Sequence, residues 1–376
     1  MTADVLVVGT GLIGTSIALA LRSERDVMLS DPDPGALDGA RARGAGRVWD
    51  GRESAGLVVV CAPPLRIASE VVRLMRLEIG VTVTHVGSVQ ARVQSEVEAS
   101  AKEMSRFCGG HPLAGRERSG PSAATAELFA GRTWAICPGR WTSAQARLDV
   151  AELAVSVGAH PITLDPDEHD RAVALVSHLP QVAASALAAQ LVPGAGTAAV
   201  LAGPGLQDST RVAASDPGLW QQVLAMNAAH LAPLVSSLAR DLADVAEALQ
   251  QLAAVDGVAA GADRPTTTAG SGPSPASVVL DLLRRGVEGR RSVPLKRGER
   301  DAAFVVVAVS VVDAPGQLAA LLTTAGDGSI NVEDVRVDHV PDSPRGVIEL
   351  LVRPGVRARA VQVLRAAGWD VLGEPA

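Results

Sequence analysis

The sequence predicts an α/β protein in three parts: a domain of alternating strands and helices at 1–165, an all-helical domain at 166–290 and a small βαββαβ domain at 303–376. Three observations lead to this division. Short apolar runs alternate with helical patterns up to residue 165. The next stretch is rich in Ala, Leu, Val and Gln at helical spacing. A polar, basic linker at 290–301 then precedes a last series of strands and helices.

Composition narrows the class of protein. The 376 residues suggest two or three domains, and a hydrophobic content of 47% is ample for their cores. Because aromatic residues make up only 2%, those cores must consist mainly of Val, Leu and Ala. A net charge of -7 argues against nucleic acid or an anionic membrane as a partner. The same charge is compatible with a local basic pocket for a small acidic substrate.

The cysteines indicate the cellular compartment in which the protein is expected. They lack the spacing of a metal site, so no metal is expected, and they read as reduced thiols of a cytoplasmic protein. No signal peptide is expected before the first strand, and no apolar run approaches the roughly 20 residues of a membrane span. The three cysteines are Cys61, Cys108 and Cys137.

The first strand ends in a glycine-rich turn. Residues 4–14 read DVLVVGTGLIG and a helical pattern follows, which is the setting of a Rossmann-type dinucleotide site. Gly9 allows the tight turn, and Gly14 lets helix and strand pack closely. Gly11 lets the backbone approach a pyrophosphate at the helix N-terminus. The predicted cofactor turn also contains Leu12 and Ile13.

A second strand at 27–31 ends in Asp31, at the distance along the chain where an acid contacts the ribose hydroxyls of a dinucleotide. Its carboxylate would repel a 2′-phosphate, so the sequence favours NAD over NADP. The alternative is a glycine turn beside an ordinary helix-capping aspartate.

More strands follow in the first domain, and in a doubly wound sheet ligands bind at the carboxyl ends of the strands. The glycine turn, the Gly87-Ser88 turn and His111 should therefore share one crevice. Ser88 has a second interpretation, as the N-cap of the helix that follows it. The predicted strands are 57–61, 81–86, 107–110, 133–137 and 161–164, with a helix at 65–77.

The stretch at 107–120, FCGGHPLAGRERSG, carries the strongest candidate for catalysis. Two glycines let the backbone approach a ligand closely, and Pro112 holds His111 in an extended conformation. A histidine fixed at the end of a strand and followed by a charged loop suits a catalytic group. The alternative is a capped surface turn.

The helical domain opens with a polar segment at 164–191. Asp170 and Ser177 are seven residues apart and share a helix face, with His169 and His178 beside it. A metal site is one interpretation of the acids and His169. A solvated helix start is favoured, since acids stabilise the N-terminal turn. The acids in question are Asp165, Asp167 and Glu168.

Polar residues gather again at 202–227, between glycines in an apolar domain, which suggests a pocket. Asp208 and Arg211 lie there, three residues apart, and a surface ion pair is the alternative. One long amphipathic helix at 228–255 and a last helix near 277–286 follow. Helices so rich in Ala and Leu suggest a dimer interface.

The third part is predicted to be ferredoxin-like, from its βαββαβ order. A separate small module after an enzyme-sized unit suggests regulation or assembly. Its predicted strands are 304–312, 330–340, 346–352 and 369–372, and its predicted helices are 316–325 and 357–367.

In combination these motifs resemble the prephenate/arogenate dehydrogenase family of tyrosine biosynthesis, with a C-terminal ACT domain. The motifs are GTGLIGTS, HVGSV, GGHPLAGRERSG, HDRAVALVSHLPQ and GLQDSTRVAASDPGLW, and DAPGQL and INVEDV in the third part. The resemblance implies oxidative decarboxylation of prephenate: NAD⁺ takes the C4 hydride, the ring carboxylate leaves as CO₂, and the ring becomes aromatic.

The resemblance also assigns roles to residues. His111 matches the family's catalytic histidine, and Ser88 matches the serine that hydrogen-bonds it and the substrate hydroxyl. Arg211 matches the arginine that binds a substrate carboxylate, and His178 a second pocket histidine. The acids that pair with this arginine and gate the pocket are matched by Glu117 and Asp208.

Several questions stay open. The family usually has Asp and Lys where this chain has His85 and Gln90. The motifs do not decide between prephenate and arogenate, and a non-catalytic NAD or amino-acid sensor is an alternative from another class. An aromatic amino acid is expected to bind the ACT domain as an effector, with a purely structural dimerisation module as the alternative. The expected effector residues are Asp313, Gly316 and Asn331.

Overall fold

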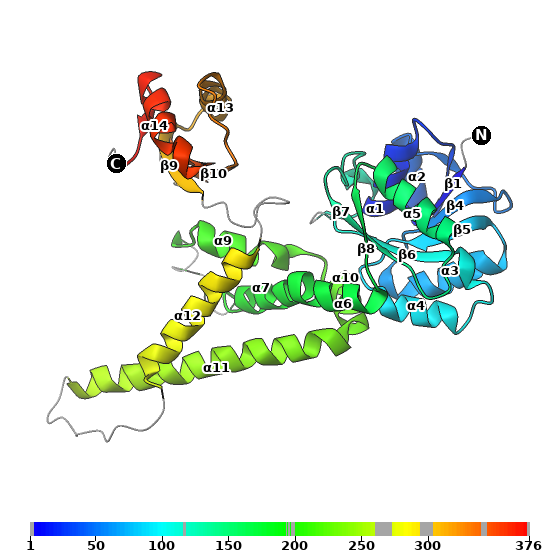
Figure 1. The fold of residues 1–376 in the computed structure, drawn as a ribbon, viewed down its shortest axis with the longest axis horizontal. Coiled ribbons are helices and arrows are strands. Elements are labelled where there is room, and N and C mark those ends of the chain that lie inside the picture. The colour runs from blue at the N-terminus through cyan, green and yellow to red at the C-terminus, as the bar shows by residue number, and fades with distance from the viewer. Residues whose placement is uncertain are drawn as a thin grey trace. The chain divides into compact units, whose positions relative to one another are not determined.

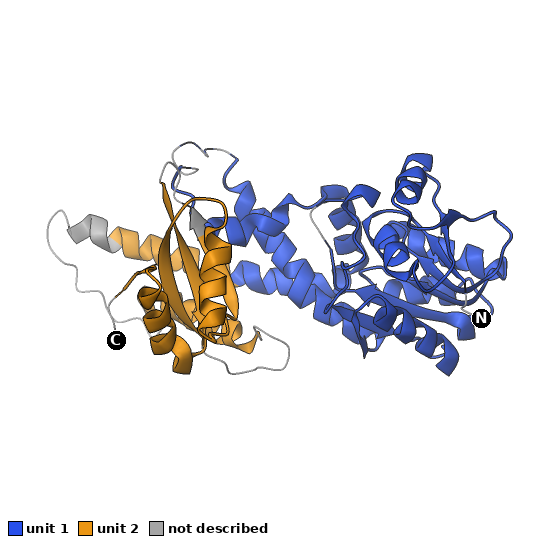
Figure 2. Cartoon of the chain, turned by 90° about the horizontal axis from the view of Figure 1, so that it is seen from above, with its two compact units in different colours: residues 1–240 blue, residues 241–376 orange. Residues whose placement is uncertain are grey.

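The computed structural model describes residues 4–115, 118–192, 194, 196, 200–259, 273–293, 304–339 and 344–373. The chain forms two compact units, Met1–Arg240 and Asp241–Ala376 (Figure 2). The division between them falls inside a single long helix, α11 (Ala228–Ala259).

An eight-stranded sheet forms the centre of the first unit, in the order β3-β2-β1-β4-β5-β6-β7-β8. Figure 1 labels β1 and β4 to β8 of this sheet. Every neighbouring pair is parallel except β6 and β7, which are antiparallel. The predicted doubly wound α/β domain is therefore confirmed. The strands are β1 (Val5–Val8), β2 (Val27–Ser30), β3 (Arg47–Val48), β4 (Ala55–Val60), β5 (Gly80–His85), β6 (Phe107–Pro112), β7 (Thr133–Cys137) and β8 (His160–Thr163).

Helices cover both faces of this sheet, because alternate residues of each buried strand point to opposite sides. Val5 and Val7 of β1 join one core, and Leu6 and Val8 join the other. The first core is completed by α1 (Leu12–Leu21) and α5 (Ala144–Ser156), and the second by α3 (Ile67–Arg76) and α4 (Ala91–Glu98). A further helix, α2 (Pro34–Ala42), follows β2.

The helical part of the first unit begins with one continuous rod, formed by α6 (Pro166–Val173), a π-helical turn η4 (Ala174–His178) and α7 (Leu179–Ala189). Pro180 explains the π turn, since it has no N–H for the carbonyl four residues earlier. The backbone N–H of Leu179 instead donates to the Ala174 carbonyl, five residues back. π turns of this kind often occur at functional sites.

The rod corrects one expectation from the sequence. Pro166–Ala189 is long and apolar enough to cross a membrane, with a mean hydropathy of 1.5 over an 18-residue window. It passes that test by length and composition only. Three of its polar side chains, those of His169, Asp170 and His178, are buried inside the protein, which is typical of a packed helix.

Short helices then lead to the long ones. They are α9 (Pro204–Thr210), the 3-10 turn η5 (Arg211–Ala214), α10 (Pro217–Met226), α11 and α12 (Pro275–Ser292). Val223 and Met226 of α10 belong to the same core as α3 and α4, so the helical part is joined to the sheet by apolar packing.

The last elements alternate in the βαββαβ order that the sequence predicts: β9 (Val305–Val312), α13 (Gln317–Asp327), β10 (Asp334–His339), β11 (Arg345–Val352), α14 (Arg357–Ala366) and β12 (Asp370–Val371). The four strands form an antiparallel sheet in the order β10-β11-β9-β12. Leu321 of α13 and Leu364 of α14 are fully buried against it.

In the glycine turn after β1, packing requires two of the three glycines. Gly9 has φ of 101°, and a Cβ there would lie 2.5 Å from the Cys61 carbonyl oxygen. A Cβ on Gly14 would lie 1.9 Å from the Gly9 carbonyl oxygen, so helix α1 could not approach β1. Gly11 differs, because a Cβ there would meet nothing within 4 Å.

This difference predicts unequal effects on stability. Gly14→Ala should lower the free energy of unfolding by about 3 kcal/mol or more, because backbone rather than a flexible side chain must move. Gly11→Ala should change it by less than about 1 kcal/mol, since its φ of -70° suits alanine. Urea unfolding of both variants measures the contrast. Equal losses would contradict this account of the turn.

Candidate active site

The candidate site lies where β5 and β6 end. His85, the last residue of β5, pairs in register with Gly109 of β6, so His111 extends two residues beyond that pair. Ser88 is half-buried in the turn between β5 and α4. The glycine turn after β1 ends at the same edge of the sheet, since β1, β4, β5 and β6 are neighbouring parallel strands.

Gly109 and Gly110 are glycines because side chains crowd both of them. A Cβ on Gly109 would lie 2.4 Å from Oε1 of Gln90 and 3.2 Å from Nε2 of His85. A Cβ on Gly110 would lie 2.9 Å from Nε1 of Trp134. The two glycines therefore let buried side chains pack against the strand just before His111.

His111 stands at one end of a chain of hydrogen bonds. Its Nδ1 lies 2.9 Å from Nε2 of His169, and Nδ1 of His169 lies 2.8 Å from Oδ1 of Asp170. His169 and Asp170 are each only 1% exposed, whereas His111 is partly exposed. The chain thus runs from the buried interior of α6 to the edge of the sheet.

Asp170 also holds the start of α4. Its Oδ1 accepts the backbone N–H of Gln90 at 2.8 Å, and its Oδ2 accepts that of Ala91 at 2.9 Å. A carboxylate at a helix N-terminus is stabilised by the unpaired N–H groups and by the helix dipole. The N-cap residue of α4 is Gln90, so the interpretation of Ser88 as the N-cap is wrong.

The residues around Ser88 are fixed as well. Nε2 of Gln90 donates to the carbonyls of Gly87 and Gly110, at 2.6 and 3.1 Å. The N–H of Gly87 donates to Nδ1 of His85 at 3.0 Å. His85 and Gln90 together hold the turn that carries Ser88 against strand β6.

His178 is part of a second group. Nδ2 of Asn227 donates to the Asp170 carbonyl at 2.8 Å and lies 3.1 Å from Nδ1 of His178. Since an amide nitrogen is only a donor, Nδ1 of His178 must accept, and Nε2 carries the proton of the neutral ring. Trp220 packs edge-on against the same ring, with centroids 6.0 Å apart.

Burial keeps His85, His111 and His178 neutral. It lowers the pKa of His85 to about 3, with a smaller effect from His169. Burial likewise lowers the pKa of His178 to about 4, and the Asp170 carboxylate opposes the shift only in part. For His111, burial is again the largest cause, followed by His169, His178 and His85, and the pKa falls well below its usual range.

Comparison with known proteins supports an enzyme of defined type. The sequence model of the prephenate dehydrogenase nucleotide-binding domain matches residues 17–163, and that of the prephenate dehydrogenase dimerization domain matches 165–257. The chain belongs to the prephenate dehydrogenase family. The probable prephenate dehydrogenase NovF of Streptomyces niveus is 34% identical over 367 residues, which cover 97% of this chain and 98% of that protein.

Solved structures of the family share the fold. Prephenate dehydrogenase from Aquifex aeolicus, in complex with hydroxyphenyl propionate and NAD⁺, aligns with a TM-score of 0.61 at 23% identity and covers 78% of this chain and 99% of that one. Synechocystis arogenate dehydrogenase aligns with a TM-score of 0.58 at 21% identity. The alignment covers 77% of this chain and 100% of that one. The present chain is an NAD-dependent dehydrogenase of the prephenate dehydrogenase type.

The glycine turn fits a dinucleotide. Gly11 faces open space at the start of α1, where a pyrophosphate would meet backbone N–H groups. Oδ2 of Asp31 accepts from the backbone N–H and the hydroxyl of Thr10, at 2.6 and 3.0 Å. The Asp31 carboxylate therefore holds the turn in shape, and its contact with a ribose stays a prediction. Leu12 and Ile13 begin α1 and are half-buried.

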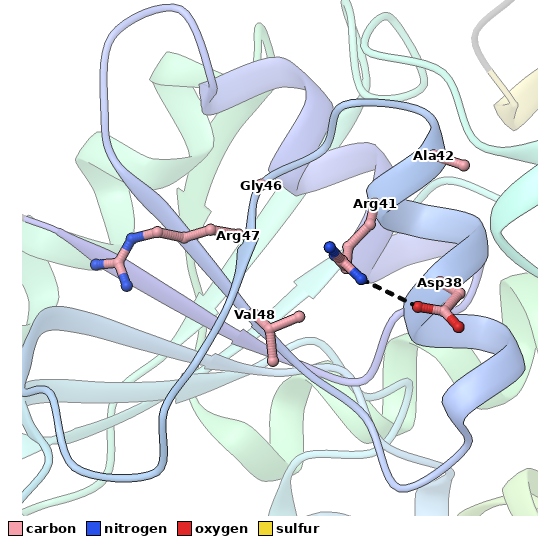
Figure 3. Close-up of a pocket in the computed structure, with 6 residues that line it drawn as sticks. All are labelled: Asp38, Arg41, Ala42, Gly46, Arg47 and Val48. Carbon is pink, nitrogen blue, oxygen red and sulfur yellow. Dashed lines mark hydrogen bonds and ion pairs between the residues drawn. The ribbon is translucent and has the colours of Figure 1, made fainter.

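A shallow depression elsewhere on this domain is not part of the site (Figure 3). It lies between the end of α2 and the start of β3, and Arg41 there pairs with Asp38 at 3.2 Å. Because β2 and β3 are parallel, the start of β3 lies at the sheet edge opposite His111. Its lining residues are Asp38, Arg41, Ala42, Gly46, Arg47 and Val48.

Two other predicted substrate residues belong to the helical part. Arg211, in η5, and Asp208, in α9, are exposed, and both elements pack against α7. Glu117 lies outside the described residues. Within the described ranges, no cluster of His, Cys, Asp and Glu is arranged to hold a metal ion, and the three cysteines are free thiols.

Sequence reasoning missed three members of the site: His169, Asp170 and Asn227. Asp165 does cap α6 as expected, accepting from the N–H groups of Asp167 and Glu168. The solvated part of the helix nevertheless ends at Glu168, because the side chains of His169 and Asp170 are buried. An adjacent His-Asp pair at the edge of an apolar helix was the available signal.

The buried histidines predict how stability depends on pH. Their folded pKa values lie below the unfolded value of about 6.5, so stability is fully present above pH 6.5. It is lost as the pH falls from there towards 4, because only the unfolded chain takes up protons. The midpoint of urea unfolding should therefore fall less steeply with pH, between pH 7 and pH 4, in His85→Gln than in the wild-type protein.

The exposed His160 supplies the control. His160→Gln should keep the wild-type slope, since it replaces an exposed ring and leaves the buried histidines in place. An unchanged slope in His85→Gln would show that His85 is not buried in its neutral form.

Proposed function

We propose that the protein catalyses the NAD⁺-dependent oxidative decarboxylation of prephenate to 4-hydroxyphenylpyruvate. The hydride on C4 of the substrate is transferred to the nicotinamide, the bond to the ring carboxylate breaks to release CO₂, and the ring becomes aromatic. As C4 becomes carbonyl-like, its hydroxyl proton must be accepted; the oxygen regains that proton when the electrons of the broken bond enter the ring. The observation that carries the proposal is a neutral histidine, His111, at the sheet edge that also holds the nucleotide turn.

His111 is the proposed base. Its Nδ1 faces His169, which leaves Nε2 for the substrate hydroxyl. A low pKa keeps the ring in its basic form at neutral pH, and a positioned base typically contributes a factor of about 10²–10⁴ to the rate. Ser88, in the turn after β5, is proposed to hydrogen-bond the same hydroxyl. His178 would donate from Nε2 to a second polar group of the substrate.

Arg211 is the proposed clamp for a substrate carboxylate, because a guanidinium binds a carboxylate through two parallel hydrogen bonds. In support, η5 packs against α7, the helix that begins next to His178. Glu117 and Asp208 are proposed to pair with this arginine and to gate the pocket.

Arogenate is the second candidate substrate, since it differs from prephenate only in an amino group in place of the keto group. The similarity in fold to the arogenate dehydrogenase of Synechocystis keeps it open. A non-catalytic NAD or amino-acid sensor is less well supported, because a sensor has no need of a base beside the nucleotide turn.

The remaining features complete the proposal. We infer three domains with boundaries near 165 and 303, a cytoplasmic location and a homodimer formed through the helical domain, which matches the family's dimerization domain. The C-terminal module is proposed to be an ACT domain that binds an aromatic amino acid, with tyrosine as the first candidate. In support, Gly316 adopts φ of 88° and opens α13 after Asp313, and Asn331 bonds Glu333 nearby in the chain.

One assay decides the reaction and the substrate. NADH formation is followed at equal concentrations of prephenate and arogenate, with NAD⁺ in excess. We expect a higher kcat/KM for prephenate. A higher value for arogenate would reassign the substrate, and no NADH from either would favour the sensor.

His111→Asn tests the base. We expect kcat to fall by about 10²–10⁴-fold, because asparagine cannot take up the proton, while the affinity for NAD⁺ changes little. His160→Asn, at an exposed position, is the matched control and should retain wild-type turnover. Near-wild-type kcat in His111→Asn would remove His111 from the role of base.

A further inference from the structure

We propose that Asp170 and His169 are positioning residues that fix the protonation pattern of His111 and the turn that carries Ser88. The inference deepens the proposed function, since it concerns the same base, but its central measurement does not depend on activity.

Hydrogen bonding alone determines which ring nitrogens carry protons. Asp170 is an acceptor, so Nδ1 of His169 must donate to it across 2.8 Å. In neutral His169 the other nitrogen, Nε2, then has only a lone pair. Nδ1 of His111 must therefore donate to it across 2.9 Å, which leaves Nε2 of His111 unprotonated. The carboxylate thus selects, through one intervening ring, the tautomer in which His111 is a base at its free nitrogen.

The same chain stabilises the charge that forms during the reaction. When His111 takes up a proton at Nε2, it becomes an imidazolium whose Nδ1–H points at His169. His169 accepts a hydrogen bond from that Nδ1–H and donates its own Nδ1–H to Asp170, so the carboxylate stays ionised and stabilises the positive charge of His111 through one intervening ring. Of the titratable side chains that influence His111, the other two, His85 and His178, are held neutral by burial.

Asp170 can stay buried as an anion because it is fully engaged. Besides His169 it accepts two backbone N–H groups at the N-terminus of α4. α4 starts at Ala91, three residues after Ser88, so the carboxylate also anchors the turn of that serine. One side chain from α6 therefore holds both groups that would touch the substrate hydroxyl.

The test is ¹⁵N NMR of the histidine rings in the full-length protein, at pH 7.5. In the wild-type protein we expect Nδ1 of His111 to be protonated and Nε2 to be unprotonated. In His169→Phe, whose ring has no acceptor, this preference should be lost, and kcat should fall by about 10²-fold with little change in the KM for NAD⁺. His169→Gln, which restores an acceptor, should recover part of the loss.

Asp165→Asn is the matched control, because it removes a carboxylate from the surface cap of the same helix. It should leave both the tautomer and kcat unchanged. If His169→Phe does not fold, Asp170→Asn tests the same point, since loss of the charge should lower kcat and shift the acid limb of the kcat/KM profile to lower pH.

Unchanged tautomers in His169→Phe, or a kcat within threefold of wild type, would overturn the proposal. If the tautomer shifts as expected but neither substrate yields NADH, the positioning role stands and the proposed function fails.

Discussion

The arrangement of the site depends on one buried carboxylate. Asp170 is 1% exposed, and an isolated ion there would be costly to bury. Its oxygens accept from His169, Gln90 and Ala91, which compensate for the lost hydration. Two of these partners belong to the start of α4, so the rod of helices α6–α7 can occupy only one position against the sheet. The same carboxylate therefore fixes both the geometry of the site and the attachment of α6 to the start of α4.

On the sheet side of the site, two glycines leave room for the side chains that hold the Ser88 turn. Gly109 and Gly110 let Gln90, His85 and Trp134 reach the backbone of β6, and Gln90 then bridges to the Ser88 turn. His85 and Gln90 stand where the family usually has Asp and Lys. Neither side chain carries a charge here, so this chain holds the turn by hydrogen bonds between neutral groups.

Local patterns predicted most of the fold. The strands, the glycine turn, Asp31 and the βαββαβ order follow from apolar spacing and turn residues within a few positions of one another. Within the first 165 residues, the sequence also indicated the shared edge of Ser88 and His111, because the topology of such sheets is regular. It could not indicate the partners of His111, since that contact joins residues 58 apart and the cap on α4 joins residues 80 apart. Acids before an apolar helix usually face water, and the burial of His169 and Asp170 depends on packing against α4 and β6.

Electrostatics supports the proposed role of an arginine in the site. The proposed substrate, prephenate, carries two carboxylates, yet His85, His111 and His178 are held neutral, and the anion Asp170 lies next to His169 in the same cluster. The cluster alone would therefore not attract the substrate. Raising the histidine pKa values would supply positive charge, but it would also remove the free lone pair that accepts the hydroxyl proton. The proposed base must stay neutral beside a proposed substrate with two negative charges. The positive counter-charge must then come from a group that does not titrate near neutral pH. A guanidinium meets that requirement, which favours the proposed role of Arg211.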